Sequence, residues 1–242
     1  MNNYKITLSY DGTLYAGWQI QKNAVTVQQK ISDALSVLLK EKVNLIGSGR
    51  TDSGVHAIGQ VANFVTGNEL DLYRFTYSLN SMLPRDIAIK KIENVEESFN
   101  SRFDARKRSY LYFIVKNKNP FWDKFAYRNG RNFDVNYLNR MCRCFIGENN
   151  FTSFCRTRSE TENKICFIYD AFWRRQNDFL IFKIEGSRFL HGMVRAITGT
   201  ILNAEKNNLD ESYIKNILIS RNREAASESV PAHGLFLYKV KY

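Results

Sequence analysis

Apolar and polar residues follow two periods along the first half of the chain, and each period predicts a different element. Residues 4–10 alternate between polar and apolar positions, which is typical of a half-buried strand. Behind Thr26, which can act as an N-cap, apolar residues recur at the spacing of an amphipathic helix. The residues on this apolar face are Val27, Ile31, Ala34, Leu35, Leu38 and Leu39.

Further patterns surround a glycine-rich loop that follows this helix. Residues 43–46 predict a short strand that leads into the loop, and residues 60–66 predict a strand that leads out of it. A second helix is predicted over residues 72–82 and is ended by Pro84, because the residue before a proline disfavours helical backbone. Residues 86–92 alternate as a further strand. We expect the flanking strands to hold the loop firmly.

The hydrophobic periodicity lapses over residues 100–107 and then returns in a similar order, which predicts two halves, residues 1–106 and 107–242. The second half is predicted to contain a strand over 108–116, a helix over 136–145 behind Asp134, paired strands over 164–175 and 179–185, and then helices and a last strand. We expect an α+β fold of two α/β halves, with a mixed, largely antiparallel sheet and a central cleft between them. The chain contains only three prolines, which argues against a flexible linker.

The run from Gly47 to Ala57 holds the main candidate chemistry of the chain. Its glycines allow positive φ angles and close approach of a ligand, and Arg50 offers a permanently charged fork of donors that suits phosphate. Asp52 is the only acid of the run, and we expect it to be ionised near neutral pH beside Arg50. An ionised aspartate can act as a nucleophile or stabilise a cation, as in retaining cleavage of a glycosidic bond. A tight turn with a capping aspartate is the alternative interpretation.

Other site types do not match these residues. A P-loop ends in Gly-Lys-Ser or Gly-Lys-Thr, whereas Arg50 follows the glycine here, and a dinucleotide fingerprint would need a glycine where Asp52 stands. The three histidines, His56, His191 and His233, lie in unrelated contexts. They give no support to a zinc deaminase or a metallohydrolase, and we expect no metal site.

The charge balance points to a polyanionic partner. The chain has 242 residues, with 35 Lys and Arg against 24 Asp and Glu, which gives a net charge of +11 and a pI near 9.5. Nucleic acid is favoured over membrane, because no apolar run is long enough to span a bilayer. The first residues lack the pattern of a signal peptide, so we expect a cytoplasmic protein. The cysteines, Cys142, Cys144, Cys155 and Cys166, match no zinc spacing, and we expect buried free thiols.

Two residues of the second half are further candidates. Tyr110 lies in an aromatic strand next to several cations, where it could be a stacking platform for an unpaired base or an ordinary aromatic residue of the sheet. Periodicity does not decide which face of this strand meets the core. Arg195 lies among apolar neighbours in a segment of helical character. A buried arginine requires an anion, for which Asp52 or an RNA phosphate would serve, and the alternative is a side chain that reaches the helix edge.

These residues belong to a series of motifs by which the chain resembles the tRNA pseudouridine synthase A family over nearly its whole length. The series runs, in order, Tyr10-Asp11-Gly12 with Gly17-Trp18-Gln19 and Thr26-Val27-Gln28; Gly49-Arg50-Thr51-Asp52-Ser53-Gly54-Val55-His56-Ala57; Leu79-Asn80 with Leu83-Pro84 and Asp86-Ile87; Ala105-Arg106 with Tyr110 and Tyr112; Phe151-Thr152-Ser153-Phe154; Met193-Val194-Arg195; and Gly234-Leu235-Phe236-Leu237. Ser53 stands where many relatives have alanine.

The resemblance implies roles that we carry forward as expectations. Asp52 would be the catalytic aspartate, Arg50 would help to extrude the target nucleotide, Tyr110 would stack on the flipped uracil, and Arg195 would pair with the aspartate. The expected activity is isomerisation of uridine to pseudouridine in the anticodon stem-loop of tRNA, in a cleft that the second half completes. The family also implies a homodimer bridged by tRNA, without a metal or an organic cofactor. A catalytically silent tRNA-binding module and a base-excising RNA glycosylase remain as alternatives.

Overall fold

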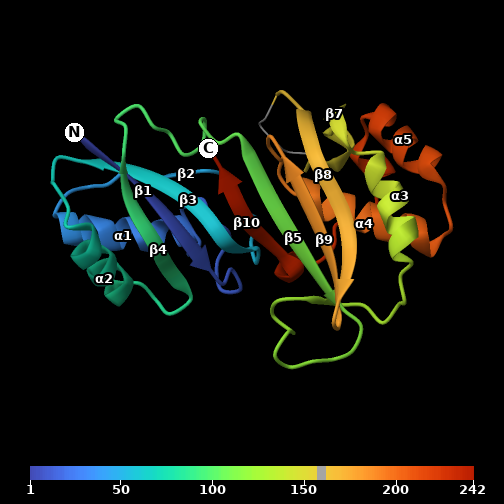
Figure 1. Cartoon of the computed structure of the whole chain (residues 1–242), viewed down its shortest axis with the longest axis horizontal. Coiled ribbons are helices and arrows are strands. Elements are labelled where there is room, and N and C mark those ends of the chain that lie inside the picture. Colours follow the sequence, from blue (N-terminus) through green and yellow to red (C-terminus); the bar gives the residue numbers. More distant parts are fainter. Residues whose placement is uncertain (157–161) are drawn as a thin grey trace. The chain divides into compact units, whose positions relative to one another are not determined.

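The computed structural model describes residues 1–156 and 162–242 of the chain. These residues form two compact units, which are coloured along the sequence in Figure 1. The first unit consists of Met1–Arg106 together with Leu237–Tyr242, and the second consists of Lys107–Phe236. The last six residues of the chain therefore belong to the first unit.

The first unit is built on a sheet whose strand order is β4-β1-β3-β10, with β2 paired to β3. The strands are β1 (Asn2–Tyr10), β2 (Ile46–Gly47), β3 (His56–Thr66), β4 (Ile87–Val95) and β10 (Leu235–Lys241). The strand β1 is antiparallel to both β3 and β4. Its apolar residues Tyr4, Ile6 and Leu8 are almost completely buried, which confirms the strand predicted from the alternation over residues 4–10.

Two helices belong to this unit, α1 (Val27–Leu39) and α2 (Leu72–Met82), and both were predicted from the sequence. The Thr26 side chain accepts a hydrogen bond from the backbone of Gln29, which confirms the predicted N-cap of α1. Asp71 caps α2 in the same way. The apolar face of α1 is buried, whereas Leu79 is the one residue of α2 that is buried.

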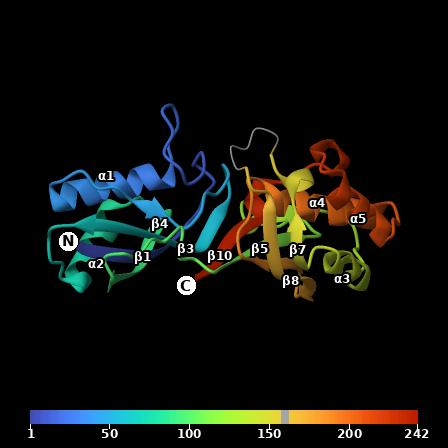
Figure 2. The same cartoon turned by 90° about the horizontal axis from the view of Figure 1, so that it is seen from above.

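The second unit contains an antiparallel sheet in the order β5-β9-β8-β7, and the short strand β6 pairs parallel to β5. Its strands are β5 (Lys107–Val115), β6 (Tyr127–Arg128), β7 (Gly147–Asn150), β8 (Ile165–Gln176) and β9 (Phe179–Gly186). Its α-helices are α3 (Val135–Arg143), α4 (Met193–Lys206) and α5 (Glu211–Ser220), with 3-10 turns at Thr152–Phe154, Arg223–Ala225 and Ala232–Gly234. Figure 2 shows the three α-helices grouped beside the sheet of this unit. The predicted α+β class with mainly antiparallel pairing is confirmed.

The prediction of a strand over residues 43–46 is wrong, because only Ile46–Gly47 pairs with β3. Val43 and Leu45 are buried, so the alternation of apolar residues is real, but side chains replace the strand partner. The Val43 N–H donates to the Ser36 hydroxyl, and the Gln28 amide donates to the Leu45 carbonyl over 2.7 Å. A backbone that is satisfied by side chains needs no neighbouring strand.

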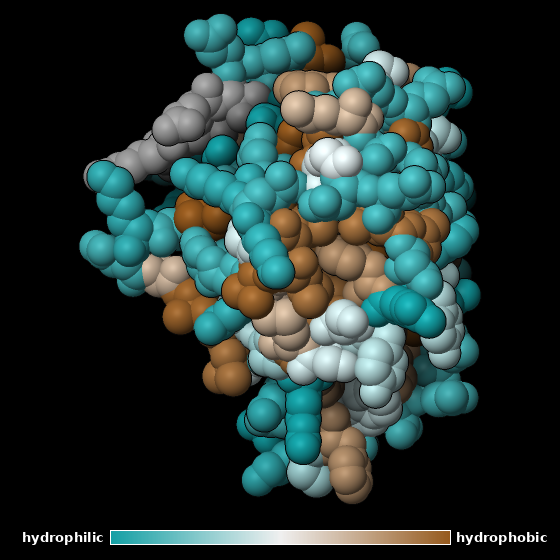
Figure 3. All heavy atoms as spheres, turned by 90° about the vertical axis from the view of Figure 1, so that its left-hand side faces the viewer, coloured by the Kyte–Doolittle hydropathy of each residue, from teal (hydrophilic) through white to brown (hydrophobic). Residues whose placement is uncertain are grey.

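Apolar and hydrophilic residues are mixed on the surface of the protein. Figure 3 shows one face, on which apolar residues, in brown, lie among hydrophilic ones, in teal. Among the described residues, no helix is both long and apolar enough to cross a bilayer. Cys142, Cys155 and Cys166 are buried free thiols as predicted, whereas Cys144 is only half-buried.

Candidate active site

The candidate site is the loop between β2 and β3, which carries Arg50 and Asp52. The start of the loop is fixed to β3 by the buried side chain of Gln60. The Ser48 hydroxyl donates to the Gln60 side-chain oxygen over 2.7 Å, and the Gln60 amide donates to the Gly49 carbonyl over 3.1 Å. The Ser48 N–H also bonds to the Val61 carbonyl over 2.7 Å. The residue before Arg50 is therefore attached to a central strand.

The end of the loop is a tight turn around Asp52. The Val55 N–H donates to the Asp52 carbonyl over 3.2 Å, and Gly54 takes a φ of +75°, which favours glycine. Val55 is buried, Asp52 is half-buried and Arg50 is exposed. The loop thus presents a carboxylate at the boundary between core and solvent, two residues from a cation in water.

A segment from β1 to the start of α1 lies directly against this loop. The Tyr10 hydroxyl and the Thr51 hydroxyl are 2.8 Å apart, and the Trp18 N–H donates to the Thr51 carbonyl over 3.2 Å. The Tyr15 carbonyl accepts hydrogen bonds from the Gly54 N–H over 3.3 Å and from the Ser53 hydroxyl over 3.2 Å. Both neighbours of Asp52 in the chain are therefore bonded to this segment.

Close contact between the two segments depends on glycine. A Cβ atom at Gly12 would lie 2.0 Å from the Val55 carbonyl oxygen, and a Cβ atom at Gly17 would lie 2.3 Å from the Thr51 carbonyl oxygen. Neither distance is possible between a methyl group and an oxygen. These two contacts explain why glycine occurs at both positions between β1 and α1.

His56 follows the loop at the first position of β3 and is buried. Its Nδ1 accepts the Gly12 N–H over 3.0 Å and also lies 3.1 Å from a carboxylate oxygen of Asp11. A ring nitrogen that accepts a hydrogen bond from the Gly12 N–H carries no hydrogen of its own, so in this geometry it does not also donate to Asp11. His56 joins the two segments as a hydrogen-bond acceptor.

Tyr110 and Arg195 belong to the second unit. Tyr110 shares the buried face of β5 with Tyr112 and Ile114. This is the face that meets the core, which periodicity did not decide. Its ring packs edge-on against Phe189, with the centroids 5.1 Å apart. Arg195 lies in the first turn of α4 and is half-buried rather than buried, and its Nε donates to the Val230 carbonyl over 2.8 Å.

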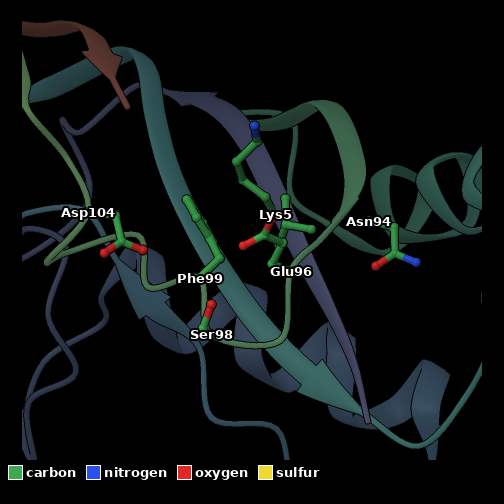
Figure 4. A pocket seen from close by; sticks show the side chains of 7 residues that line it. Lys5, Asn94, Glu96, Ser98, Phe99 and Asp104 are labelled. Carbon is green, nitrogen blue, oxygen red and sulfur yellow. The ribbon is translucent and has the colours of Figure 1, made fainter.

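Two hollows lie on the units outside this loop, and their charges differ. A hollow of about 740 Å³ in the first unit contains one cation and two acids. Figure 4 shows it, and its lining residues are Lys5, Asn94, Val95, Glu96, Ser98, Phe99 and Asp104. A hollow of about 330 Å³ in the second unit contains four cations and one acid, and is lined by Thr152, Cys155, Arg156, Lys164, Arg221, Asn222, Arg223 and Glu224. The second hollow is the one suited to an anion.

The chemistry available at the loop follows from its rigidity and its charges. Hydrogen bonds fix the residues on either side of Asp52, so its carboxylate can be kept at a fixed distance from a reacting carbon. Nucleophilic or electrostatic catalysis at a sugar requires such a fixed distance. Arg50 can contact a phosphate of the same ligand. Among residues 1–156 and 162–242, no three His, Cys, Asp or Glu side chains form a group that could hold a metal ion.

The positive net charge, the α+β fold and the carboxylate in a rigid loop together define a candidate enzyme that acts on a polyanionic substrate. Sequence comparison identifies the family. The sequence model of the tRNA pseudouridine synthase family matches residues 6–104 and 141–242, and this chain belongs to that family. The family is one of isomerases, and the first matched segment contains the whole Asp52 loop.

Curated relatives match along almost the entire chain. A tRNA pseudouridine synthase A from Bacillus subtilis (strain 168) is 41% identical over 242 residues, which cover 98% of each chain. The protein of the same name from Brachyspira hyodysenteriae is 42% identical over 244 residues and covers 99% of this chain and 98% of its own. Resemblance to the family, as inferred from the ordered motifs, is confirmed.

Proposed function

We propose that this protein isomerises uridine to pseudouridine in the anticodon stem-loop of tRNA, with Asp52 as its catalytic residue. The observation that supports this proposal most directly is the loop itself. Asp52 is the one acid of a loop that is bonded to β3 at its start and to the Tyr15 carbonyl after the aspartate. This loop lies within a segment that matches the family.

The reaction balances without an external reagent. The bond between uracil N1 and ribose C1′ breaks, the base turns, and a bond forms between C5 and C1′. The proton on C5 leaves to solvent and N1 gains a proton, so the reaction is an isomerisation that needs no external oxidant or reductant. A carboxylate at C1′ serves this reaction either as a nucleophile or through a glycal route, and both routes require Asp52.

The other expected roles are part of the same proposal. Arg50 is exposed beside Asp52, where it can enter the stack that the target nucleotide leaves. Tyr110 would stack on the flipped uracil, and Arg195 would pair with the carboxylate. Extrusion of a base from a stem costs a few kcal/mol, so these contacts to the flipped state carry part of the substrate preference.

The decisive experiment compares Asp52→Asn with the wild type on tRNA tritiated at uracil C5. We expect release of tritium to collapse while tRNA affinity persists, because the amide keeps the shape and loses the charge. The matched control is Asp33→Asn, because Asp33 is an exposed aspartate of α1 that accepts a hydrogen bond from Gln29 on its own helix. Unchanged tritium release by Asp52→Asn would remove this residue from the mechanism.

The two alternative functions give different products in the same experiment. A base-excising glycosylase would leave an abasic ribose, which lowers the mass of the RNA, whereas isomerisation leaves the mass unchanged. A silent tRNA-binding module would bind tRNA without releasing tritium. Mass spectrometry of digested product RNA therefore separates excision from the other two functions, and tritium release separates isomerisation from silent binding.

We also propose that the protein acts in the cytoplasm as a homodimer that one tRNA bridges. Exposed apolar side chains at alternate positions of β8 support self-association, since Ile165, Phe167 and Tyr169 are 45%, 41% and 40% exposed. Sedimentation velocity at micromolar protein should give a species of twice the 28.2 kDa chain mass. A monomer at all concentrations would contradict this part of the proposal.

A further inference from the structure

Asp86 and Tyr15 lie 71 residues apart in the sequence and are joined by a short hydrogen bond. The Tyr15 hydroxyl donates to a carboxylate oxygen of Asp86 over 2.6 Å. This length falls in the range of charge-assisted O–H···O⁻ bonds, which are stronger than neutral ones. Tyr15 is only 5% exposed and Asp86 is half-buried, so the bond is partly shielded from water.

Asp86 also holds the other end of the same segment. Its backbone carbonyl accepts the Asp11 N–H over 2.9 Å, while its side chain accepts the Tyr15 hydroxyl. A single residue, directly before β4, thus fixes both ends of residues 11–15. The Tyr15 N–H closes the segment by donating to the Gly12 carbonyl over 3.1 Å.

The segment fixed in this way is the one that supports the Asp52 loop. Its last residue, Tyr15, accepts two hydrogen bonds from the residues that directly follow Asp52, namely Ser53 and Gly54. At Gly12 the backbone of the segment meets the Val55 carbonyl so closely that no Cβ fits. A shift of Tyr15 would therefore shift the turn that contains the aspartate.

We propose that Tyr15 and Asp86 are positioning residues for Asp52, which transmit the fixed position of β4 through the Tyr15 carbonyl to the catalytic turn. This inference rests on the proposed function, because it assigns a role in the reaction of Asp52. Neither side chain touches the substrate in this mechanism. Their effect is to keep the Asp52 carboxylate at the distance from ribose C1′ that the reaction needs.

The chemistry of the pair keeps the bond intact over the working range of pH. Burial, and next the hydrogen bond to Asp86, raise the pKa of Tyr15 far above its ordinary value of 10.0. The hydroxyl therefore remains a donor at every pH at which the enzyme is assayed. A loss of the bond must come from a change in sequence.

The test is a pair of substitutions that remove the bond from either side. Tyr15→Phe removes the donor and keeps the ring, and Asp86→Ala removes the acceptor. Misplacement of a catalytic group by about 1 Å costs on the order of 100-fold in rate, so we expect kcat to fall by between about tenfold and 100-fold. KM for tRNA should remain within about twofold, since the contacts of the RNA with the surface are unchanged.

Two further variants distinguish positioning from a general effect on stability. Asp86→Asn keeps an oxygen that can accept from Tyr15, and we expect it to recover most of kcat. Tyr137→Phe is the matched control, because its half-buried hydroxyl donates to the Ala204 carbonyl over 2.9 Å in the second unit. It should lower the melting temperature as much as Tyr15→Phe does, and it should leave kcat unchanged.

The outcomes separate this inference from the proposed function. If the wild type makes pseudouridine and Asp52→Asn does not, while Tyr15→Phe keeps full kcat, the positioning role is overturned and the function stands. An equal loss of kcat in Tyr137→Phe would also overturn it, since the effect would then be one of stability. If the wild type makes no pseudouridine in tRNA, both proposals fall.

Discussion

The α-carbon of Gly17 faces the carbonyl of Thr51 so closely that an added Cβ would lie 2.3 Å from that oxygen. Gly17 also takes a φ of +91°, a backbone conformation that other residues adopt only with strain. The next residue, Trp18, donates its N–H to the same oxygen over 3.2 Å. Thr51 directly precedes Asp52, so this contact sets the approach of the chain to the carboxylate.

Gly17→Ala should therefore displace the loop and lower stability together. The strained φ alone costs about 1–3 kcal/mol, and the clash with Thr51 adds to it. We expect a lower melting temperature and a loss of pseudouridine formation, measured by thermal unfolding and by tritium release. Gly67→Ala is the control, because a Cβ there meets nothing within 4 Å. Full activity of Gly17→Ala would show that the loop tolerates the displacement.

Arg50 is expected to act on the extrusion of the target base, and its effect should depend on the structure of the RNA. Arg50→Ala should lower kcat/KM more for a uridine in a base-paired stem than for the same uridine in an open single strand, which needs little extrusion. Arg74→Ala, an exposed arginine of the same unit that pairs with Asp71, serves as the control. Equal losses on paired and unpaired RNA would assign Arg50 to phosphate binding alone.

Much of the fold could be predicted from the sequence where local signals agree. The helix α1 has an N-cap at Thr26 and one apolar face, and α2 is closed by Pro84, so their ranges follow directly. The strand over residues 43–46 could not be rejected from its alternation, because the bonds that replace its partner come from Ser36 and Gln28 on a helix. Side-chain hydrogen bonds that take the place of a strand partner can be recognised only in the folded structure.

Some residues of the candidate site could be predicted from the sequence, and others are recognised only in the structure. Arg50 and Asp52 could be selected as site candidates from the sequence, since their types and spacing within eleven residues carry the chemistry. The scaffold residues Tyr15 and Asp86 could not, because their bond spans 71 residues. The face of Tyr110 was undecidable for another reason, since both faces of β5 are apolar in the sequence and only packing distinguishes them.

Cys166 should make the stability of the protein depend on alkaline pH. It is 1% exposed, and burial raises the pKa of its thiol from 9.0 to about 11. A raised pKa in the folded state stabilises the fold below about pH 9, and this contribution is lost as the pH rises towards 11. The loss approaches about 3 kcal/mol for a shift of this size.

The measurement is the free energy of unfolding in urea between pH 8 and 11 for the wild type and Cys166→Ser. Serine has a similar shape and does not ionise in this range, so the difference between the two proteins should shift in favour of the variant as the pH rises. Parallel curves for the two proteins would mean that the thiolate is accommodated without a penalty.

The basic hollow of the second unit should contact a phosphate of tRNA. This hollow of about 330 Å³ is lined by one acid, Glu224, and by four cations, Arg156, Lys164, Arg221 and Arg223. Each phosphate that a cation neutralises releases counterions, so Arg221→Gln should weaken tRNA binding and reduce the slope of log K against log salt by about 0.7–1. Arg74→Gln on α2 should leave the slope unchanged. Fluorescence anisotropy from about 50 to 200 mM salt measures both, and an unaltered slope for Arg221→Gln would place the phosphates elsewhere.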